Sequence, residues 1–113
     1  MNVTTSRHEG IVVLTVHETR LTYPLLADFA TATADQIGIG EKQIVIDLSS
    51  VGYVDSATIG CLMDLYRQAT AAGGRLRLAG VQKRVETMLT MTGAHHFLEV
   101  HGDLPSALAS FGG

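Results

Sequence analysis

The sequence predicts an α/β fold built on a largely parallel sheet. Short runs rich in β-branched residues alternate with longer segments of helical periodicity along the chain. Strands that are separated by helices favour parallel pairing through right-handed crossovers. The length, 113 residues, fits a single hydrophobic core. We therefore expect one domain over residues 1–113, with a mixed, mostly parallel sheet of about five strands and about four helices.

The N-terminal third is expected to begin with an antiparallel pair at one edge of the sheet. Residues 11–16 form a β-branched run after Gly10, and residues 3–7 are their predicted partner, with residues 8–10 as the turn. A helix is then expected from Pro24, because apolar residues recur at helical spacing as far as Ile37. Gly38 and Gly40 can end that helix.

The middle of the chain contains its most strand-like run, residues 44–48. The run is almost continuously apolar, as expected of a central strand that is covered on both faces. Residues 49–55 are predicted to connect it to a second helix, which begins at Ser56 and closes at Gly73 and Gly74. One apolar stripe of that helix comprises Ile59, Leu62, Met63, Tyr66 and Ala69.

The remaining elements follow in the same alternating order. Residues 75–79 alternate with period two and predict a half-buried strand. Residues 81–89 predict a third helix, capped near Gly93, and residues 97–100 predict a last short strand. A terminal helix is expected to start at Asp103 or Pro105.

Composition excludes several classes of protein. A hydrophobic fraction of 46% with a mean hydropathy of +0.24 argues against disorder. A net charge of −3 argues against a nucleic-acid binder, which needs a concentrated basic surface. The single cysteine, Cys61, cannot form an internal disulfide and fits a reducing compartment. Without a bilayer-spanning run or a signal-peptide pattern at the N-terminus, we expect a cytoplasmic protein that does not enter a membrane.

Ser56 is the residue that points most directly to function. A buried strand leads into a loop that delivers this serine to a helix N-terminus. One interpretation is a structural N-cap, because the serine oxygen can accept a hydrogen bond from an unpaired amide of the first turn. The other is a phosphoacceptor, because free N–H groups and the helix dipole tolerate a phosphate there. The residues alone leave both interpretations open.

Two runs around this loop resemble a known family. They are Ile46-Asp47-Leu48-Ser49 and Val54-Asp55-Ser56-Ala57. This pattern is similar to that of STAS domains, in particular bacterial anti-sigma-factor antagonists, and the resemblance extends over residues 10–111. It implies the STAS fold, in which the sheet carries an antiparallel edge pair.

The resemblance implies a regulatory switch without catalysis or a cofactor. Family members bind an anti-sigma factor that is typically a serine kinase, and thereby free a sigma factor. The kinase phosphorylates the serine that matches Ser56, a phosphatase resets the switch, and several members are monomers when free. On this basis the predicted partner-binding residues are Leu21, Thr22, Asp55, Ser56, Ala57, Thr58, Ile59 and Gly60.

The chain departs from the family pattern at two places. Thr58 stands where the family commonly has glycine, which narrows the kinases that fit or offers a second phosphoacceptor. Many antagonists also carry a Gly-x-Leu-Asp turn before the first helix, and its acid contacts the partner. Here the matching residues are 19–22, so Leu21 is followed by Thr22 and both the glycine and the acid are missing.

Other functions are weighed against the switch. A scaffold in a signalling or transport assembly would use Ser56 only as a cap, and a small-ligand or nucleotide-binding domain would use the helix N-terminus as an anion site. No nearby Cys or Glu completes a ligand set with the adjacent pair His95-His96, so no metal site is expected. A hydrolase is disfavoured because no Gly-x-Ser-x-Gly surrounds the serine. The basic residues Arg75, Arg77, Lys83 and Arg84 form either a solvated face or a patch for an acidic partner.

Overall fold

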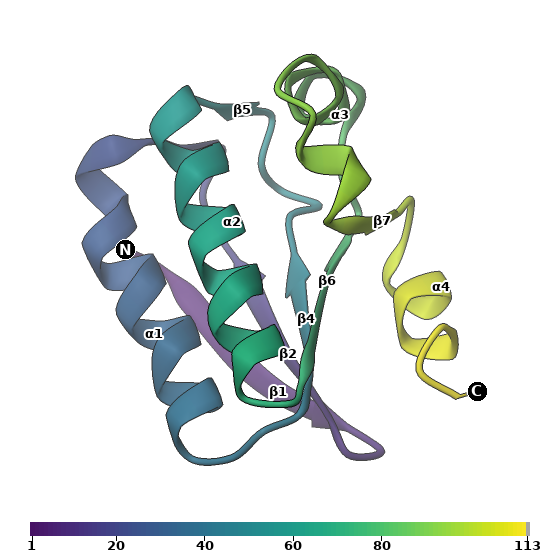
Figure 1. The fold of residues 1–113 in the computed structure, drawn as a ribbon. Coiled ribbons are helices and arrows are strands. Elements are labelled where there is room, and N and C mark those ends of the chain that lie inside the picture. Colours follow the sequence, from purple (N-terminus) through teal and green to yellow (C-terminus); the bar gives the residue numbers. More distant parts are fainter. Residues whose placement is uncertain (113) are drawn as a thin grey trace.

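A five-stranded mixed sheet forms the centre of the molecule (Figure 1). The computed structural model describes residues 1–112, and Gly113, the last residue of the predicted domain, lies outside them. In spatial order the strands are β1 (Val3–His8), β2 (Ile11–Val16), β4 (Gln43–Asp47), β6 (Arg75–Ala79) and β7 (Glu99–His101). β1 and β2 are antiparallel and all other neighbours are parallel, so the predicted fold class is confirmed.

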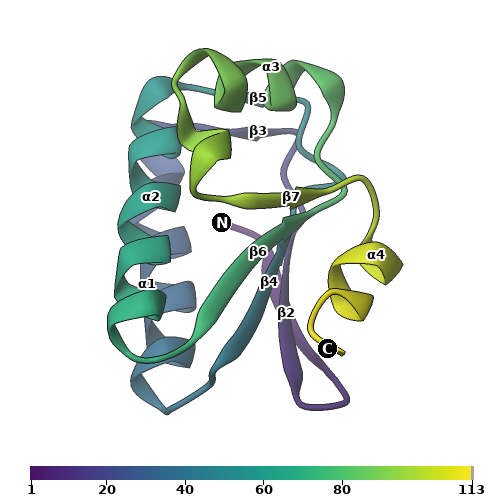
Figure 2. The same cartoon turned by 45° about the vertical axis from the view of Figure 1, so that its right-hand side comes forward.

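Helices cover both faces of the sheet, but unequally (Figure 2). Two long helices lie side by side on one face, together with the shorter α3, and α4 lies on the other. The helices are α1 (Leu26–Gly38), α2 (Ser56–Ala71), α3 (Lys83–Met91) and α4 (Leu104–Ala109), with 3-10 turns η1 (Tyr23–Leu25) and η2 (Ala94–His96). None of the helices in residues 1–112 combines the length and apolarity needed to cross a bilayer.

The core divides into two clusters because side chains alternate across each strand. Ile44 and Ile46 of β4 belong to the larger cluster, under α1, α2 and α3. Val45 belongs to the smaller one, which packs against Ala107 of α4. All four residues from Ile44 to Asp47 are buried, as predicted for a central strand.

Several boundaries differ from the sequence prediction, each for a local reason. The first hairpin turn is shorter than expected: Glu9 and Gly10 both have positive φ, 53° and 83°, which is the geometry of a two-residue hairpin turn. The last strand starts at Glu99 rather than at residue 97, because η2 continues the chain after α3 and the Leu98 N–H bonds the Ala94 carbonyl.

One strand pair was missed by the sequence analysis. β3 (Arg20–Leu21) and β5 (Tyr53–Val54) form a second, two-stranded parallel sheet. β5 lies within the segment that was predicted to be only a connection. A strand of two residues is too short to show a periodicity, so the sequence pattern could not reveal it. The pairing joins segments that are distant in the chain.

Candidate functional site

Asp55 caps the N-terminus of α2. Its Oδ1 accepts a hydrogen bond of 2.9 Å from the Thr58 N–H. Of the two interpretations of Ser56, the structural N-cap is therefore excluded: Ser56 is the first residue of the helix, and its side chain is exposed. An aspartate satisfies the free amides of a first turn as well as a serine does. The consequence is that the Ser56 hydroxyl is not needed for the cap.

Asp55 also joins α2 to the segment before α1. Its Oδ2 accepts a hydrogen bond of 3.0 Å from the Tyr23 N–H, 32 residues earlier in the chain. Burial raises the pKa of the Asp55 carboxyl, but the hydrogen bonds from Thr58 and Tyr23 outweigh it and hold the pKa below its usual value. The carboxylate is thus charged at neutral pH, directly beside Ser56.

Thr58 makes the second link between the same two segments. Its hydroxyl oxygen lies 2.7 Å from the Leu21 carbonyl oxygen and 2.7 Å from Asp55 Oδ1, and its one hydrogen can bond either acceptor. The Thr58 side chain is fully buried. The residue that departs from the family pattern therefore has a structural role, and its buried hydroxyl is not accessible to a kinase.

The β3–β5 pair fixes the two loops further. The Gly52 N–H donates to the Thr19 carbonyl at 2.8 Å. The guanidinium carbon of Arg20 lies 4.3 Å from the centre of the Tyr53 ring, within the range of a cation–π contact. These contacts hold the end of the β3 segment against the loop that leads to Ser56.

The predicted partner-binding residues fall into two groups by exposure. Ser56, Ala57 and Gly60 are exposed, and Thr22 and Asp55 are half-buried. Leu21, Thr58 and Ile59 are buried, with at most 4% of their surface exposed. Ser56, Ala57 and Gly60 thus make up an exposed surface at the start of α2, and the buried residues belong to the structure beneath it.

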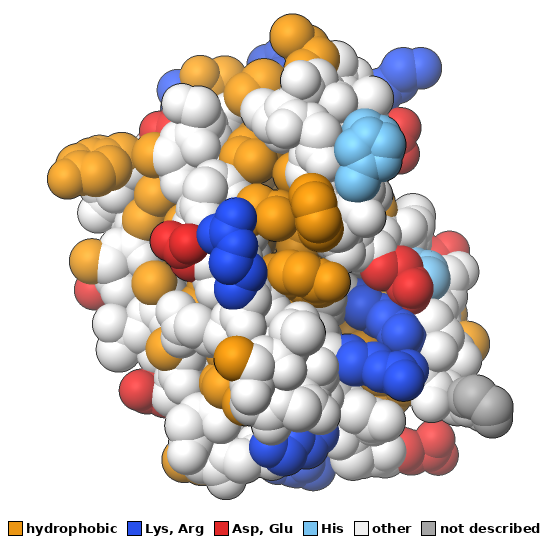
Figure 3. Space-filling model, viewed as in Figure 1, with side chains coloured by type: hydrophobic (Ala, Val, Ile, Leu, Met, Phe, Trp, Pro, Cys, Tyr) orange, Lys and Arg blue, Asp and Glu red, His pale blue; other side chains and the backbone are white. Residues whose placement is uncertain are grey.

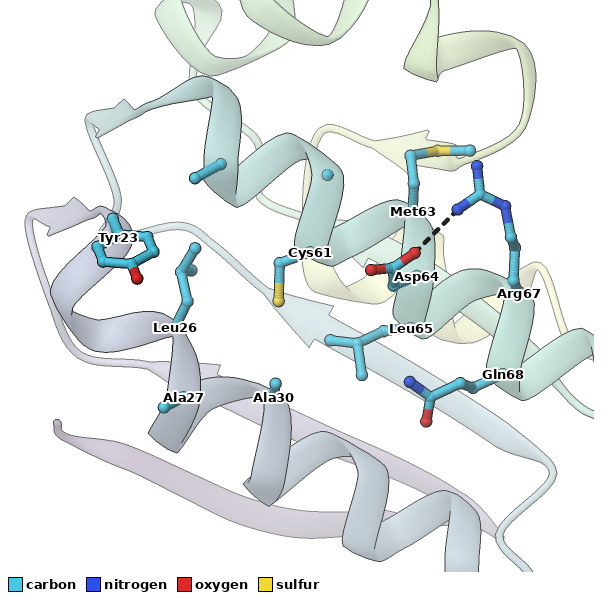
Figure 4. A pocket seen from close by; sticks show the side chains of 12 residues that line it. Tyr23, Leu26, Ala27, Ala30, Cys61, Met63, Asp64, Leu65, Arg67 and Gln68 are labelled. Carbon is cyan, nitrogen blue, oxygen red and sulfur yellow. Dashed lines mark hydrogen bonds and ion pairs between the residues drawn. The ribbon is translucent and has the colours of Figure 1, made fainter.

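A groove runs from this surface between α1 and α2. Its volume is about 650 Å³. Figure 4 shows Cys61 and Leu65 pointing from α2 toward α1, where Ala30 lies opposite them. The lining residues are Tyr23, Leu26, Ala27, Ala30, Ala57, Gly60, Cys61, Met63, Asp64, Leu65, Arg67 and Gln68.

Few charged or reactive groups border the groove. Asp64 and Arg67 form an exposed ion pair at its rim, with Oδ1 and an Nη atom 3.0 Å apart (Figure 4). Burial, and to a smaller extent the Asp64 charge, raises the pKa of the Cys61 thiol. A thiol with a raised pKa is a poor nucleophile at neutral pH. Cys61 is therefore not activated as a nucleophile.

Polar contacts with residues near the end of β6 also hold the loop after β4. Asp47 Oδ1 accepts from the Ser49 N–H at 2.9 Å, and the Gln82 side-chain amide donates to the Ser49 carbonyl at 2.8 Å. Gly80 permits this packing, because a Cβ there would lie 2.7 Å from Ser49 Cβ and its φ is +69°. The loop is thus tied to the end of β6 as well as to β3.

The histidine pair singled out in the sequence lies on the surface. His95 and His96 are exposed, with ring centres 4.0 Å apart. Within residues 1–112, no group of three or more His, Cys, Asp and Glu side chains is placed to hold a metal ion.

Tyr23 is the site residue that sequence reasoning missed. Its side chain is 73% exposed at the rim of the groove, while its N–H binds Asp55. An aromatic residue directly before Pro24, at the entry to a predicted helix, was the available signal. Only the fold brings it beside the start of α2.

The family model for the STAS domain matches residues 2–107 of the chain. This match agrees with the fold and with the sequence pattern of the loop before α2. The chain belongs to the STAS domain family. A protein of Thermotoga neapolitana, provisionally named an anti-sigma factor antagonist, is 26% identical over 69 residues. That match spans 61% of this chain and 61% of the curated relative's length.

Solved structures of other STAS domains have the same fold. An anti-sigma-factor antagonist (STAS) domain protein from Planctomyces limnophilus superimposes with a TM-score of 0.89, at 16% identity and over 98% of each chain. The anti-sigma factor antagonist SpoIIAA, in its unphosphorylated form, gives a TM-score of 0.72 at 17% identity over 99% of each chain. At these identities the likeness establishes the fold.

Proposed function

We propose that this STAS domain is an anti-sigma-factor antagonist controlled by phosphorylation of Ser56. In this proposal it binds an anti-sigma factor that is also a serine kinase, and so frees the sigma factor. The kinase inactivates it by phosphorylating Ser56, and a phosphatase restores it. The protein has no catalytic activity of its own and acts in the cytoplasm as a monomer when free.

The position of Ser56 is the observation that carries the proposal. The side chain is exposed in the first turn of α2, and Asp55 rather than Ser56 caps the helix. A kinase can therefore modify the hydroxyl without removing the cap. The names of similar proteins support the same function, since one is an anti-sigma factor antagonist described in its unphosphorylated form.

A phosphate on Ser56 would act on docking more than on the fold. It would add about −1.5 to −2 charges next to the Asp55 carboxylate. Ala57 and Gly60, on the same surface, carry no group that could pair with it. A partner that docks over this surface and the groove would then bury the unpaired charge of the phosphate, and this weakens binding. Thr22, which replaces the usual acid, points to a kinase with a different contact at that position.

The first experiment is phosphopeptide mapping of the protein isolated from its native cells, in growth and under stress. We expect phosphate at Ser56 with an occupancy that differs between the two conditions. Binding is then measured with the purified anti-sigma kinases of the same organism. We expect Ser56→Ala to keep the affinity and Ser56→Asp to weaken it at least about tenfold.

Ser106 provides the matched control. It is exposed in the first turn of α4, which also follows an aspartate cap, so Ser106→Asp makes the same charge change elsewhere. We expect it to leave binding unchanged. If Ser56 is unmodified under every condition and Ser56→Asp binds like the wild type, the switch is wrong and the non-switching scaffold takes its place. If Ser56→Asp instead abolishes binding of a small anion, the surface is a ligand site.

A further inference from the structure

β1 forms one edge of the main sheet. It pairs with β2 in an unbroken register from Val3 to His8, and no other strand of residues 1–112 pairs with it. All of its residues after Val3 are exposed. An edge strand of six residues carries unpaired backbone donors and acceptors along its outer side, and another strand can add there.

The hairpin turn decides which backbone groups of β1 face outward. In an antiparallel pair, only every second residue exchanges hydrogen bonds with the residue opposite. The two-residue turn makes His8 and Ile11 such a pair. At the other end of the strand, the Asn2 carbonyl accepts a hydrogen bond of 2.8 Å from the His17 N–H, which fits the same alternation. The residues whose backbone groups point away from β2 are therefore Val3, Thr5 and Arg7.

The two edges of the sheet differ in their protection. The opposite edge strand, β7, has only three residues, and Glu99 on it contacts Arg77 at 3.0 Å and His101 at 2.7 Å. Figure 3 shows acidic and basic side chains next to one another between β7 and α4. Short strands and charged side chains commonly protect a sheet edge from further pairing. β1 is longer, and it contains no proline, lysine or bulge that would block pairing.

The outer side of β1 is complementary to itself. In a symmetric antiparallel pair of two copies, Thr5 can lie opposite Thr5 of the second copy, and Val3 then lies opposite Arg7. In this register each outward-facing residue of the strand meets another, so all of them can exchange backbone hydrogen bonds. Pairs of threonines are favourable between neighbouring strands. No like charges lie directly opposite, because Arg7 faces Val3 and forms an ion pair with Glu41 of its own chain.

We propose that two copies of this protein associate through their β1 strands, which joins the two sheets into one continuous sheet. The contact consists of one strand edge from each copy, which is less than the roughly 1,000 Å² of a stable interface. We therefore expect a dissociation constant of about 0.1 mM. Well below that concentration the chain is the monomer of the proposed function.

Pairing at β1 leaves the candidate site free. No residue of β1 lines the groove between α1 and α2, and the Ser56 surface belongs to α2. Each copy in the dimer therefore presents its own Ser56 surface. The two proposals can fail separately: Ser56→Asp should leave self-association unchanged, and variants of Thr5 should keep the binding of an anti-sigma kinase.

Sedimentation equilibrium of the whole protein, from about 10 µM to about 1 mM, measures the association. We expect a monomer–dimer equilibrium for the wild type. Thr5→Lys places two lysines opposite each other and should raise the dissociation constant about tenfold, and Thr5→Glu should do the same. An equimolar mixture of these two variants should form heterodimers at least as tightly as the wild type dimerises, because opposite charges then meet. Thr5 is exposed, so both variants should fold.

Ser6→Lys is the matched control. Ser6 is the next exposed residue of β1, and in the proposed register it lies opposite Thr4, so the two new lysines do not face each other. We expect this variant to raise the dissociation constant less than about threefold. Thr5→Pro removes an outward-facing N–H without removing a hydrogen bond to β2, so it should weaken the dimer at least about tenfold and keep the fold.

Three results would overturn the proposal. The first is a wild-type protein that stays monomeric at every concentration, in which case a strand of a different protein is the remaining occupant of this edge. The second is equal weakening by Ser6→Lys and Thr5→Lys. The third is a mixture of Thr5→Lys and Thr5→Glu that associates no better than either variant alone.

Discussion

Two helices of this protein start in the same way and serve different purposes. Asp55 caps α2 by accepting a hydrogen bond of 2.9 Å from the Thr58 N–H. Asp103 caps α4 by accepting one of 2.8 Å from the Ser106 N–H. Each cap is followed by an exposed serine in the first turn, Ser56 in α2 and Ser106 in α4. The two helix starts share the aspartate cap and a serine in the first turn, at the first helical position in α2 and at the third in α4.

The difference lies in what else each aspartate binds. Asp55 also accepts from the Tyr23 N–H at 3.0 Å and approaches the Thr58 hydroxyl, which in turn reaches the Leu21 carbonyl. Asp103 is exposed, and its cap bond is local. The α2 cap thus joins two distant segments and borders a groove, while the α4 cap only ends a short helix. A local motif becomes a candidate site through its tertiary contacts.

The largest expected effect comes from removing the two caps in turn. Asp55→Ala should lower the free energy of unfolding by about 2 kcal/mol, because the Tyr23 amide and the Thr58 side chain lose an acceptor together with the cap. Asp103→Ala should cost about 1 kcal/mol or less. Urea unfolding at neutral pH measures both. Equal losses would mean that the tertiary bonds of Asp55 add nothing.

A smaller effect is expected from Thr58→Val, which keeps the side-chain shape and removes the hydroxyl. The buried Leu21 carbonyl loses its donor, so we expect a loss of about 1 kcal/mol. Thr87→Val is the control: the Thr87 hydroxyl bonds the Lys83 carbonyl within an exposed turn of α3, where water can replace it. Urea unfolding of the two variants should therefore differ. A Thr58→Val protein as stable as the Thr87→Val protein would contradict the proposed bridge.

Lowering the pH should weaken both caps, because both aspartates have a lower pKa in the folded protein than in the unfolded chain. Hydrogen bonds hold the pKa of Asp55 below its usual 3.8 despite burial, and bonds from Ser106 do the same for the pKa of Asp103. The unfolded chain binds protons first as the pH falls below about 3.8, so the stabilisation is present above that pH and lost as the pH drops through the lower native pKa.

Asparagine variants separate the charge from the cap, because asparagine also caps helices well. Asp55→Asn and Asp103→Asn should each flatten the fall in unfolding free energy on the acid side of pH 5. Denaturation across a series of pH values measures this. If Asp55→Asn leaves the pH dependence of the unfolding free energy unchanged, this carboxylate contributes nothing to stability through its charge.

The smallest effect on stability is expected at the serines themselves. Ser56→Asp should change the unfolding free energy by less than about 0.5 kcal/mol, since an acid in a first turn is favoured by the helix dipole and opposed by the neighbouring aspartate. Ser106→Asp should cost more than Ser56→Asp, because it also removes the hydroxyl that bonds Asp103. Thermal unfolding of both variants tests this. A large loss for Ser56→Asp alone would mean that the phosphate acts on the fold, and the docking explanation would then fail.

Much of this site could be predicted from local sequence. The pattern around Ser56 places the serine at a helix start, and the helix does begin there. The sequence left open whether Ser56 is the cap, because two adjacent residues, Asp55 and Ser56, are both good caps and local rules do not choose between them. Tyr23 bonds Asp55 across 32 residues of the chain, so local sequence rules could not predict its role.

The order of strands and helices, the antiparallel first hairpin and the buried central strand were determined by the sequence itself. Each depends on residues close together in the chain, through periodicity, β-branching and turn glycines. Tertiary structure decided which residues meet: Tyr23 with Asp55, and Thr58 with Leu21. Those contacts join segments more than 20 residues apart, and only packing of the whole chain brings them together.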